Sequence, residues 1–177
     1  WLAARSEGGG MVLRLEDLDP DRCRPEYCAQ VMRDLEWLGL DWDGEPVYQS
    51  RRTELYAAAF RALEGQGLIY PCFCSRAERL AASAPHRSDG TAVYDGRCGR
   101  LSEEERAVRA KLRRPAWRVR MPEETVSFSD RLQGVFEENL GRDCGDFILR
   151  RSDGVYAYQL AVVVDDAAMG VTQVVRG

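Results

Sequence analysis

The chain has 177 residues, of which 45% are hydrophobic and 31% charged, an ordinary composition for a globular domain with its own core. Its formal net charge of -4 argues against a protein that holds nucleic acid by bulk electrostatics, because such proteins carry a basic excess. No apolar run approaches the ~20 residues that cross a bilayer, and the first residues lack the pattern of a secretory signal. We therefore expect a cytoplasmic monomer without a membrane partner.

Helical and strand patterns alternate over the first 70 residues. Residues 1–8 predict the end of a helix, and residues 11–15 predict a strand that runs into an acidic segment. Apolar residues recur at helical spacing over 25–39 and 51–66, and both patterns stop at glycine. Residues 68–70 again predict a strand. This order of strand, helix, helix and strand predicts an α/β fold with a doubly wound parallel sheet.

The periodicity breaks down at Pro71, and we interpret residues 71–145 as an insert. Ser102 and Glu105 have the spacing of a capping box, which predicts a helix that reaches about residue 112. Strand-like alternation follows and predicts an antiparallel region over 117–121, 126–128 and 135–137.

The last part of the chain is more apolar. Residues 147–149 and 171–175 predict strands, and we favour a helix over 158–168, although residues 161–164 also suit a buried strand. The expected division is therefore a first part of the core over 1–70, the insert, and a return to the core over 146–177.

Four of the six cysteines fall in the insert, and three of these stand near its start. Cys72, Cys74 and Cys98, together with Tyr94, could offer four ligands to zinc. Their spacing equally suits small buried cysteines, because zinc sites more often place two residues between paired cysteines and tyrosine is an uncommon ligand. A loop-rich insert is nevertheless a segment that a structural metal can hold together. Cys23, Cys28 and Cys144 have no partner at ligand spacing.

Polar residues stand where predicted strands end or a buried helix begins. The acidic segment 14–19, which includes Glu16, follows the first strand, and one of its carboxylates could bind the ammonium group of an amino acid. Tyr158 and Arg176 form a second candidate pair, in which the guanidinium could make a bidentate contact with a carboxylate. An acidic turn and an exposed strand end explain the same residues as well.

Positive charge is densest in one part of the insert and in the pair Arg150 and Arg151. These residues form either a solvated face or local contacts to phosphate. In the insert they are Arg109, Lys111, Arg113, Arg114, Arg118 and Arg120.

Seven segments follow one another in the order known from one enzyme family, at 13–19, 37–42, 48–50, 72–75, 94–98, 162–166 and 171–177. With these segments, the sequence resembles the glutamyl-tRNA synthetase family of class I aminoacyl-tRNA synthetases over nearly its whole length. Gln159 stands where the full synthetases usually have asparagine, so residues 156–161 resemble the glutamyl-queuosine branch of this family. The resemblance implies a Rossmann-like doubly wound parallel sheet with a zinc-containing insert.

The resemblance also implies roles for individual residues. Glu16 would hold the glutamate ammonium, Tyr158 would line the same pocket, and Arg176 would pair with a substrate carboxylate. One structural zinc would be closed by four protein ligands, and the resemblance implies no catalytic residue in this stretch. These zinc ligands are Cys72, Cys74, Tyr94 and Cys98.

The implied activity is an ATP-dependent ligation in which L-glutamate is activated, with Mg²⁺ accompanying ATP, and passed to queuosine at the wobble position of tRNA(Asp). The family's two nucleotide-binding motifs do not appear, so we expect a fragment; Gln173 also departs from the histidine common there. Two alternatives stay open. The chain could be the core of a full glutamyl-tRNA synthetase that charges tRNA(Glu), which a C-terminal anticodon-binding domain in the parent would reveal, or a non-catalytic zinc-stabilised binding module.

Overall fold

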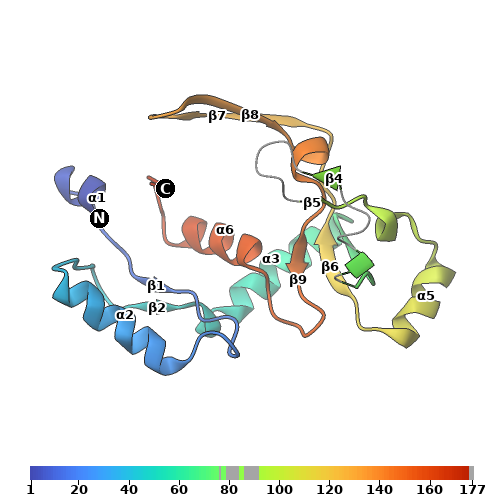
Figure 1. Cartoon of the computed structure of the whole chain (residues 1–177), viewed down its shortest axis with the longest axis horizontal. Coiled ribbons are helices and arrows are strands. Elements are labelled where there is room, and N and C mark those ends of the chain that lie inside the picture. Colours follow the sequence, from blue (N-terminus) through green and yellow to red (C-terminus); the bar gives the residue numbers. More distant parts are fainter. Residues whose placement is uncertain (76, 79–83, 86–91, 176–177) are drawn as a thin grey trace. The chain divides into compact units, whose positions relative to one another are not determined.

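The computed structural model describes residues 1–75, 77–78, 84–85 and 92–175 (Figure 1). The chain divides into two compact units. Unit 1 comprises Trp1–Ala58 and Leu160–Gly177, and unit 2 comprises Ala59–Gln159. Among the helices of the described residues, none has the length and apolar character needed to cross a membrane.

Unit 1 contains a parallel pair of strands joined by a helix. In this pair, β1 (Arg14–Leu15) lies beside β2 (Val47–Tyr48), and α2 (Pro25–Trp37) forms the crossover between them. Pro25 occupies the first helical turn, as the sequence predicts, because its missing N–H is not needed there. The second parallel strand was not predicted, since two residues are too short to show a period.

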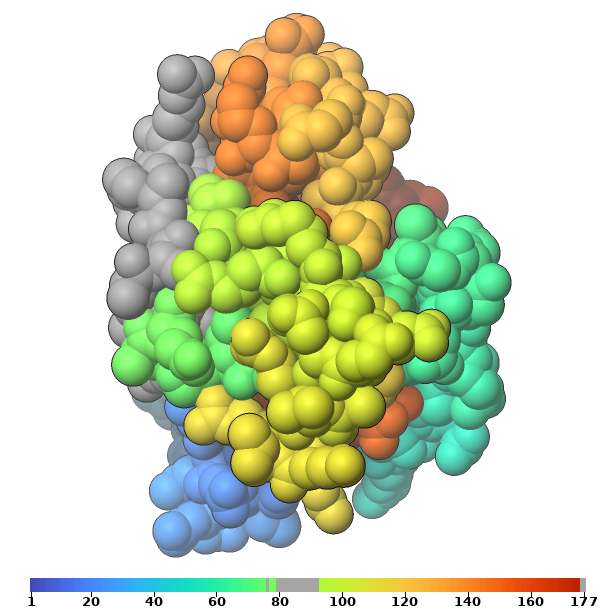
Figure 2. Space-filling model, turned by 90° about the vertical axis from the view of Figure 1, so that its right-hand side faces the viewer, coloured from blue at the N-terminus to red at the C-terminus, as the bar shows by residue number. Residues whose placement is uncertain are grey.

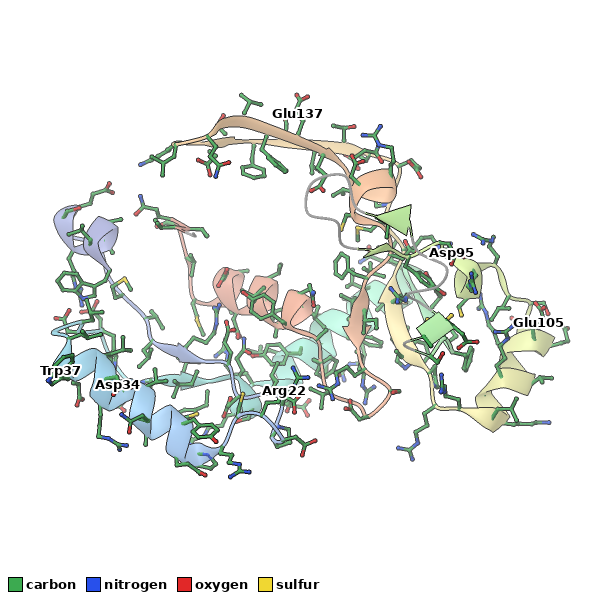
Figure 3. All side chains as sticks on the ribbon, in the orientation of Figure 1. Arg22, Asp34, Trp37, Asp95, Glu105 and Glu137 are labelled. Atoms are coloured by element: carbon green, nitrogen blue, oxygen red, sulfur yellow. The ribbon has the colours of Figure 1, made fainter. Side chains whose placement is uncertain are left out.

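The helix α2 is confirmed, but its apolar side is mostly exposed. None of its residues is buried, and Tyr27 and Val31 are 52% and 44% exposed. Trp37, at its end, is 85% exposed and points away from the helix (Figure 3). Helical spacing therefore identified the helix correctly, whereas burial of its apolar positions does not occur within this chain.

Helix α6 (Tyr158–Ala168) confirms the preference for a helix in this region, and it buries Leu160, Ala161 and Val162. The strand predicted for residues 171–175 is wrong, because these residues form no strand. Val174 and Val175 are 62% and 72% exposed, so this apolar run has no neighbouring strand in the described chain.

Unit 1 also contains α1 (Leu2–Ser6), η1 (Gln49–Arg51) and the first part of α3 (Thr53–Gly65).

A buried carboxylate links the elements of unit 1. The side chain of Asp165, on α6, has no exposed surface and accepts hydrogen bonds from three donors. These donors are Arg52 Nε at 2.7 Å, Tyr56 Oη at 2.8 Å and Gln49 Nε2 at 2.9 Å.

Arg14 of β1 extends the same network. Its Nη1 lies 2.6 Å from Asp166 Oδ1, and its Nε lies 3.9 Å from Asp165 Oδ2. Burial opposes ionisation of Asp165, but the hydrogen bonds from Arg52, Tyr56 and Gln49 hold the pKa of its carboxyl group below the ordinary value. The elements of unit 1 are therefore joined by the ionised form of the Asp165 carboxyl group.

Unit 2 is built on a three-stranded antiparallel sheet. Strand β6 (Ala116–Val119) lies between β3 (Ile69–Cys72) and β9 (Ile148–Arg150), and it runs antiparallel to both. The expectation that the strand near residue 70 continues the parallel sheet is wrong. A four-residue apolar run predicts a strand but carries no information on the direction of its partner.

The other strands of unit 2 form two small hairpins. The antiparallel region expected around 126–137 is confirmed as β7 (Thr125–Asp130) and β8 (Gly134–Asn139), with Phe128 paired across to Phe136 (Figure 1). Glu137 projects from this ribbon (Figure 3). Strands β4 (Ala84–Pro85) and β5 (Ala92–Val93) form the second hairpin. Unit 2 also contains two short helical turns, η2 (Arg97–Arg100) and η3 (Leu140–Cys144).

Helix α5 (Glu103–Leu112) confirms the predicted capping box. Ser102 Oγ accepts from the backbone N–H of Glu105, and the Glu105 carboxylate accepts from the backbone N–H of Ser102. None of its residues is buried, and the helix stands on the surface of unit 2 in yellow-green in Figure 2. Its stability therefore rests on its N-terminal cap more than on burial.

Replacing Asp165 with asparagine should destabilise the intact protein by about 2 to 4 kcal/mol, because Arg52 and Arg14 lose a buried charged partner. Urea unfolding at neutral pH measures this difference. The pKa of Asp165 is lower in the folded state, so its stabilisation is full above the unfolded value of ~3.9 and is lost as pH falls towards the folded value. The gap between wild type and variant should shrink over that acidic range.

The matched control is Glu26→Gln, which removes the same charge from a pair that is 62% and 63% exposed at 3.9 Å from Arg24. We expect a change under about 0.5 kcal/mol. Equal losses in both variants would contradict the assigned role of Asp165.

Candidate functional site

The cysteine cluster predicted from the sequence is brought together in unit 2. Cys72 ends β3, Cys74 follows it, and Cys98 lies in η2. Cys74 Sγ lies 3.4 Å from Cys98 Sγ and 3.5 Å from Tyr94 Oη, and Cys72 Sγ lies 3.6 Å from the same phenol oxygen. Cys72, Cys98 and Tyr94 are buried, whereas Cys74 is partly exposed.

These donor atoms fit a small tetrahedral metal ion. The three sulfur atoms lie within 4.8 Å of one another. A tetrahedral zinc with Zn–S bonds of about 2.3 Å places its ligand atoms about 3.8 Å apart, close to the observed spacing. The fourth atom of the group is the oxygen of Tyr94, which also accepts a hydrogen bond from the backbone N–H of Cys98 at 3.1 Å.

Arg118 supports the cluster from within the protein. Its guanidinium lies 3.8 Å from the centre of the Tyr94 ring and donates to the backbone oxygen of Asp146, and the residue is only 5% exposed. The Asp146 carboxylate in turn accepts from Tyr70 Oη and from the backbone N–H of Met121. Arg118 therefore holds the cluster in place, and the expectation that it belongs to a solvated or phosphate-binding face is wrong.

The protonation of the cluster follows from its burial. Burial opposes ionisation of Cys72, but the Arg118 guanidinium and neighbouring hydrogen bonds hold the pKa of its thiol below the ordinary value. Burial raises the pKa of Cys74 to about 11, and burial together with the adjacent thiols raises the pKa of Tyr94 as well. Protons must therefore leave when these groups bind a cation.

The acidic segment after β1 is more ordered than a simple turn. Asp17 accepts hydrogen bonds from the backbone N–H and the hydroxyl of Ser50, at 2.8 and 2.7 Å. The neighbouring Glu16 side chain is 41% exposed, and its Oε1 lies 3.4 Å from Arg14 Nη2. The sequence pattern by itself does not distinguish these two acids. In the structure, Asp17 binds Ser50 of η1, whereas the Glu16 carboxylate stays accessible.

The other two predicted substrate residues have different outcomes. Tyr158 opens α6 and is 44% exposed. Arg176 lies outside the described residues. Glu16 belongs to unit 1 and Tyr158 to unit 2, so the convergence of these residues on one pocket stays a prediction.

The carboxylate network around Asp165 was not predicted from the sequence. A signal was present, because Asp165 follows Ala161 by four residues in an apolar run and therefore lies on the same buried face of a helix. A buried carboxylate requires partners. Its partners Gln49, Arg52 and Tyr56 are distant in sequence and gave no comparable signal.

Comparison with known proteins identifies the family. The sequence model of the tRNA synthetases class I (E and Q), catalytic domain, matches residues 1–177. The chain belongs to this family. As a class I synthetase catalytic domain, it is an α/β protein, and it resembles the glutamate tRNA ligase of Elizabethkingia meningosepticum, solved with its amino acid, with a TM-score of 0.75 and 27% identity. The glutamate-tRNA synthetase of Elizabethkingia anophelis gives a TM-score of 0.77 and 28% identity; each likeness covers 97% of this chain and 38% of the solved chain.

Curated relatives of this synthetase domain are more similar in sequence. A glutamyl-Q tRNA(Asp) synthetase from Nitratidesulfovibrio vulgaris is 54% identical over the whole chain, and one from Neisseria meningitidis is 50% identical over 98% of it. The chain spans 58% and 57% of the length of these two relatives.

The cluster should bind one thiophilic divalent cation, because three thiols and a phenol oxygen stand at tetrahedral spacing. Titrating metal-free protein with Co²⁺ should produce sulfur-to-cobalt charge-transfer absorption that saturates at one ion per chain. Binding should strengthen as pH rises, since the ligands must lose protons. Cys98→Ser removes one of three thiol ligands and should lower both the affinity and the charge-transfer intensity, whereas Cys144→Ser, at a free cysteine outside the cluster, should change neither. A Cys98→Ser protein with the affinity and intensity of the wild type would contradict the site.

Proposed function

We propose that the protein containing this chain activates L-glutamate with ATP and transfers it to queuosine at the wobble position of tRNA(Asp). The single observation that carries the proposal is the 54% identity, over the whole chain, to a protein named glutamyl-Q tRNA(Asp) synthetase. Membership of the class I synthetase family supports a ligase that uses ATP, with Mg²⁺ as its counter-ion.

The proposed reaction has two steps. A glutamate carboxylate attacks the α-phosphate of ATP and pyrophosphate leaves. The resulting glutamyl-adenylate then passes its glutamyl group to the modified base, and AMP leaves as the acyl–phosphate bond breaks. Positioning and electrostatic stabilisation supply most of the catalysis in such transfers. In this chain, Glu16 binds the glutamate ammonium, Tyr158 lines the pocket and Arg176 pairs with a carboxylate. The exposed Glu16 carboxylate, steadied by Arg14, suits that role.

The cysteine cluster holds a structural zinc in this proposal. Four protein ligands leave no open position for substrate, which is the arrangement of a structural rather than a catalytic site. Zinc would fix the segment after β3 and η2 against the antiparallel sheet. The spacing of the donor atoms and the burial of three of the four ligands support this assignment, and the ligands are Cys72, Cys74, Tyr94 and Cys98.

A second candidate function is the charging of tRNA(Glu). The structural likeness to two glutamate-tRNA ligases favours it, at 27% and 28% identity. The higher identity to the glutamyl-Q relatives favours the first proposal. The match of the synthetase family to residues 1–177 favours either enzyme over a non-catalytic binding module.

The acceptor is tested by supplying the intact protein with ATP, labelled glutamate and one RNA at a time. We expect label on tRNA(Asp) that contains queuosine, and none on tRNA(Asp) without it or on tRNA(Glu). Label on tRNA(Glu) would favour the second candidate. Label on both forms of tRNA(Asp) would refute queuosine as the acceptor.

The role of Glu16 is tested by Glu16→Gln in the intact protein. Loss of a charged partner of the ammonium group costs about 1.5 to 3 kcal/mol, so the KM for glutamate in pyrophosphate exchange should rise roughly ten- to a hundredfold. The KM for ATP and the unfolding midpoint should change little, because the side chain is 41% exposed. Asp21→Asn, an exposed acid of the same segment, is the matched control. An unchanged KM for glutamate would remove Glu16 from the site.

A further inference from the structure

Three chain segments meet at one end of the antiparallel sheet of unit 2. Cys72, the last residue of β3, lies opposite Ala116, the first residue of β6. Strand β9 also runs antiparallel to β6, so its last residue, Arg150, lies towards the same end. The residues after β3, before β6 and after β9 are thereby collected in one place, although they are far apart in the sequence.

A pocket of about 640 Å³ occupies this end of the sheet. Its floor includes Cys72, Ala116 and Ile148, one from each strand. Its charged lining consists of three arginines and one aspartate, which gives a local excess of positive charge on a chain whose net charge is -4. These four residues are Arg113, Arg114, Arg151 and Asp153.

The three arginines differ in how they are held. Arg113 donates to the backbone oxygen of Phe73 at 3.4 Å, and Arg151 pairs with Asp153 at 2.6 Å. Arg114 is exposed and has no hydrogen bond or ion pair within the described part of the chain. The pocket therefore combines two tethered guanidinium groups with one that is available to a ligand.

We propose that this pocket binds the phosphodiester backbone of the RNA substrate, so that Arg113, Arg114 and Arg151 position the tRNA on unit 2. The inference rests on the proposed function, which supplies an RNA as the acceptor. Guanidinium groups match phosphate oxygens with paired N–H donors, and such contacts fix the orientation of a nucleic acid without reading its sequence. A cavity of this size admits a nucleotide unit.

The basic residues of the insert differ in what they contact. Arg118 is buried against Tyr94, and the Arg120 guanidinium lies 5.1 Å from the centre of the Tyr70 ring. Lys111 is exposed on α5 but does not line the pocket. The basic residues that are adjacent in the sequence thus fall into two groups, arginines that support the cysteine cluster and arginines that line the pocket.

The test measures binding of queuosine-containing tRNA(Asp) to the intact protein across a range of salt concentrations. Each phosphate contact contributes about 0.7 to 0.9 to the slope of log affinity against log salt. Arg114→Gln should reduce the slope by about this amount, and Arg114→Lys should retain most of it. Asp153→Asn removes a negative charge from the pocket and should tighten binding at low salt.

Lys111→Gln is the matched control, since it removes one positive charge from an exposed residue three positions away, outside the pocket. Metal content and unfolding midpoint confirm that each variant is folded. Equal slopes in Arg114→Gln and Lys111→Gln would overturn the proposal in favour of a diffuse field. A raised KM for ATP with unchanged tRNA binding would also overturn it, because the pocket would then hold nucleotide phosphate.

The outcomes separate this inference from the proposed function. If the protein binds tRNA and glutamylates it with an unaltered salt slope in Arg114→Gln, only the pocket assignment fails. If the wild-type protein neither binds nor glutamylates any tRNA, the proposed function itself fails.

Discussion

Unit 1 depends on the ionised carboxylate of Asp165. Two strands of two residues each cannot form a stable sheet by themselves, and helix α2 between them buries none of its residues. What holds these pieces is the set of hydrogen bonds and ion pairs that joins β1, η1 and α3 to α6. Desolvation of a carboxylate is costly, and only the convergence of Arg52, Tyr56 and Gln49 makes it tolerable. The fold of this unit is therefore specified by polar partners as much as by burial.

Unit 2 has a buried cluster of cysteine and tyrosine side chains in its interior. Its sheet has short strands, and helix α5 adds no buried residue. Outside the cluster, the buried apolar residues described for this unit are Phe60, Phe73, Val119 and Leu149. The cluster of Tyr70, Cys72, Tyr94 and Cys98 therefore forms a large part of the core, and Arg118 stacks on Tyr94 from the central strand. A cation bound by these ligands would stabilise the folded state directly, since the unfolded chain cannot present the same geometry.

The sequence predicted what is local and missed what is paired at a distance. Pro25 at a helix start and the box of Ser102 and Glu105 follow from short-range rules, and both are confirmed. The cysteine cluster was found because its members are chemically unusual. The direction of β3, the pairing of β1 with Val47 and Tyr48, and the partners of Asp165 were missed, because long-range pairing leaves no period in the sequence.

The proposed contact with RNA depends on where the arginines lie, because the chain as a whole is acidic. Net charge sets long-range attraction, whereas contacts depend on where guanidinium groups are fixed. Arg14 and Arg52 are committed to the carboxylates of unit 1, and Arg118 is committed to Tyr94 and Asp146. Arg113 and Arg114, before the first residue of β6, are exposed and line one pocket together with Arg151 at the end of the sheet. Because that end is built from the same peptide that carries Cys72 and Cys74, any cation that orders the cluster also fixes the wall of the pocket. The proposed metal site and the proposed RNA contact would thus depend on the same strand end.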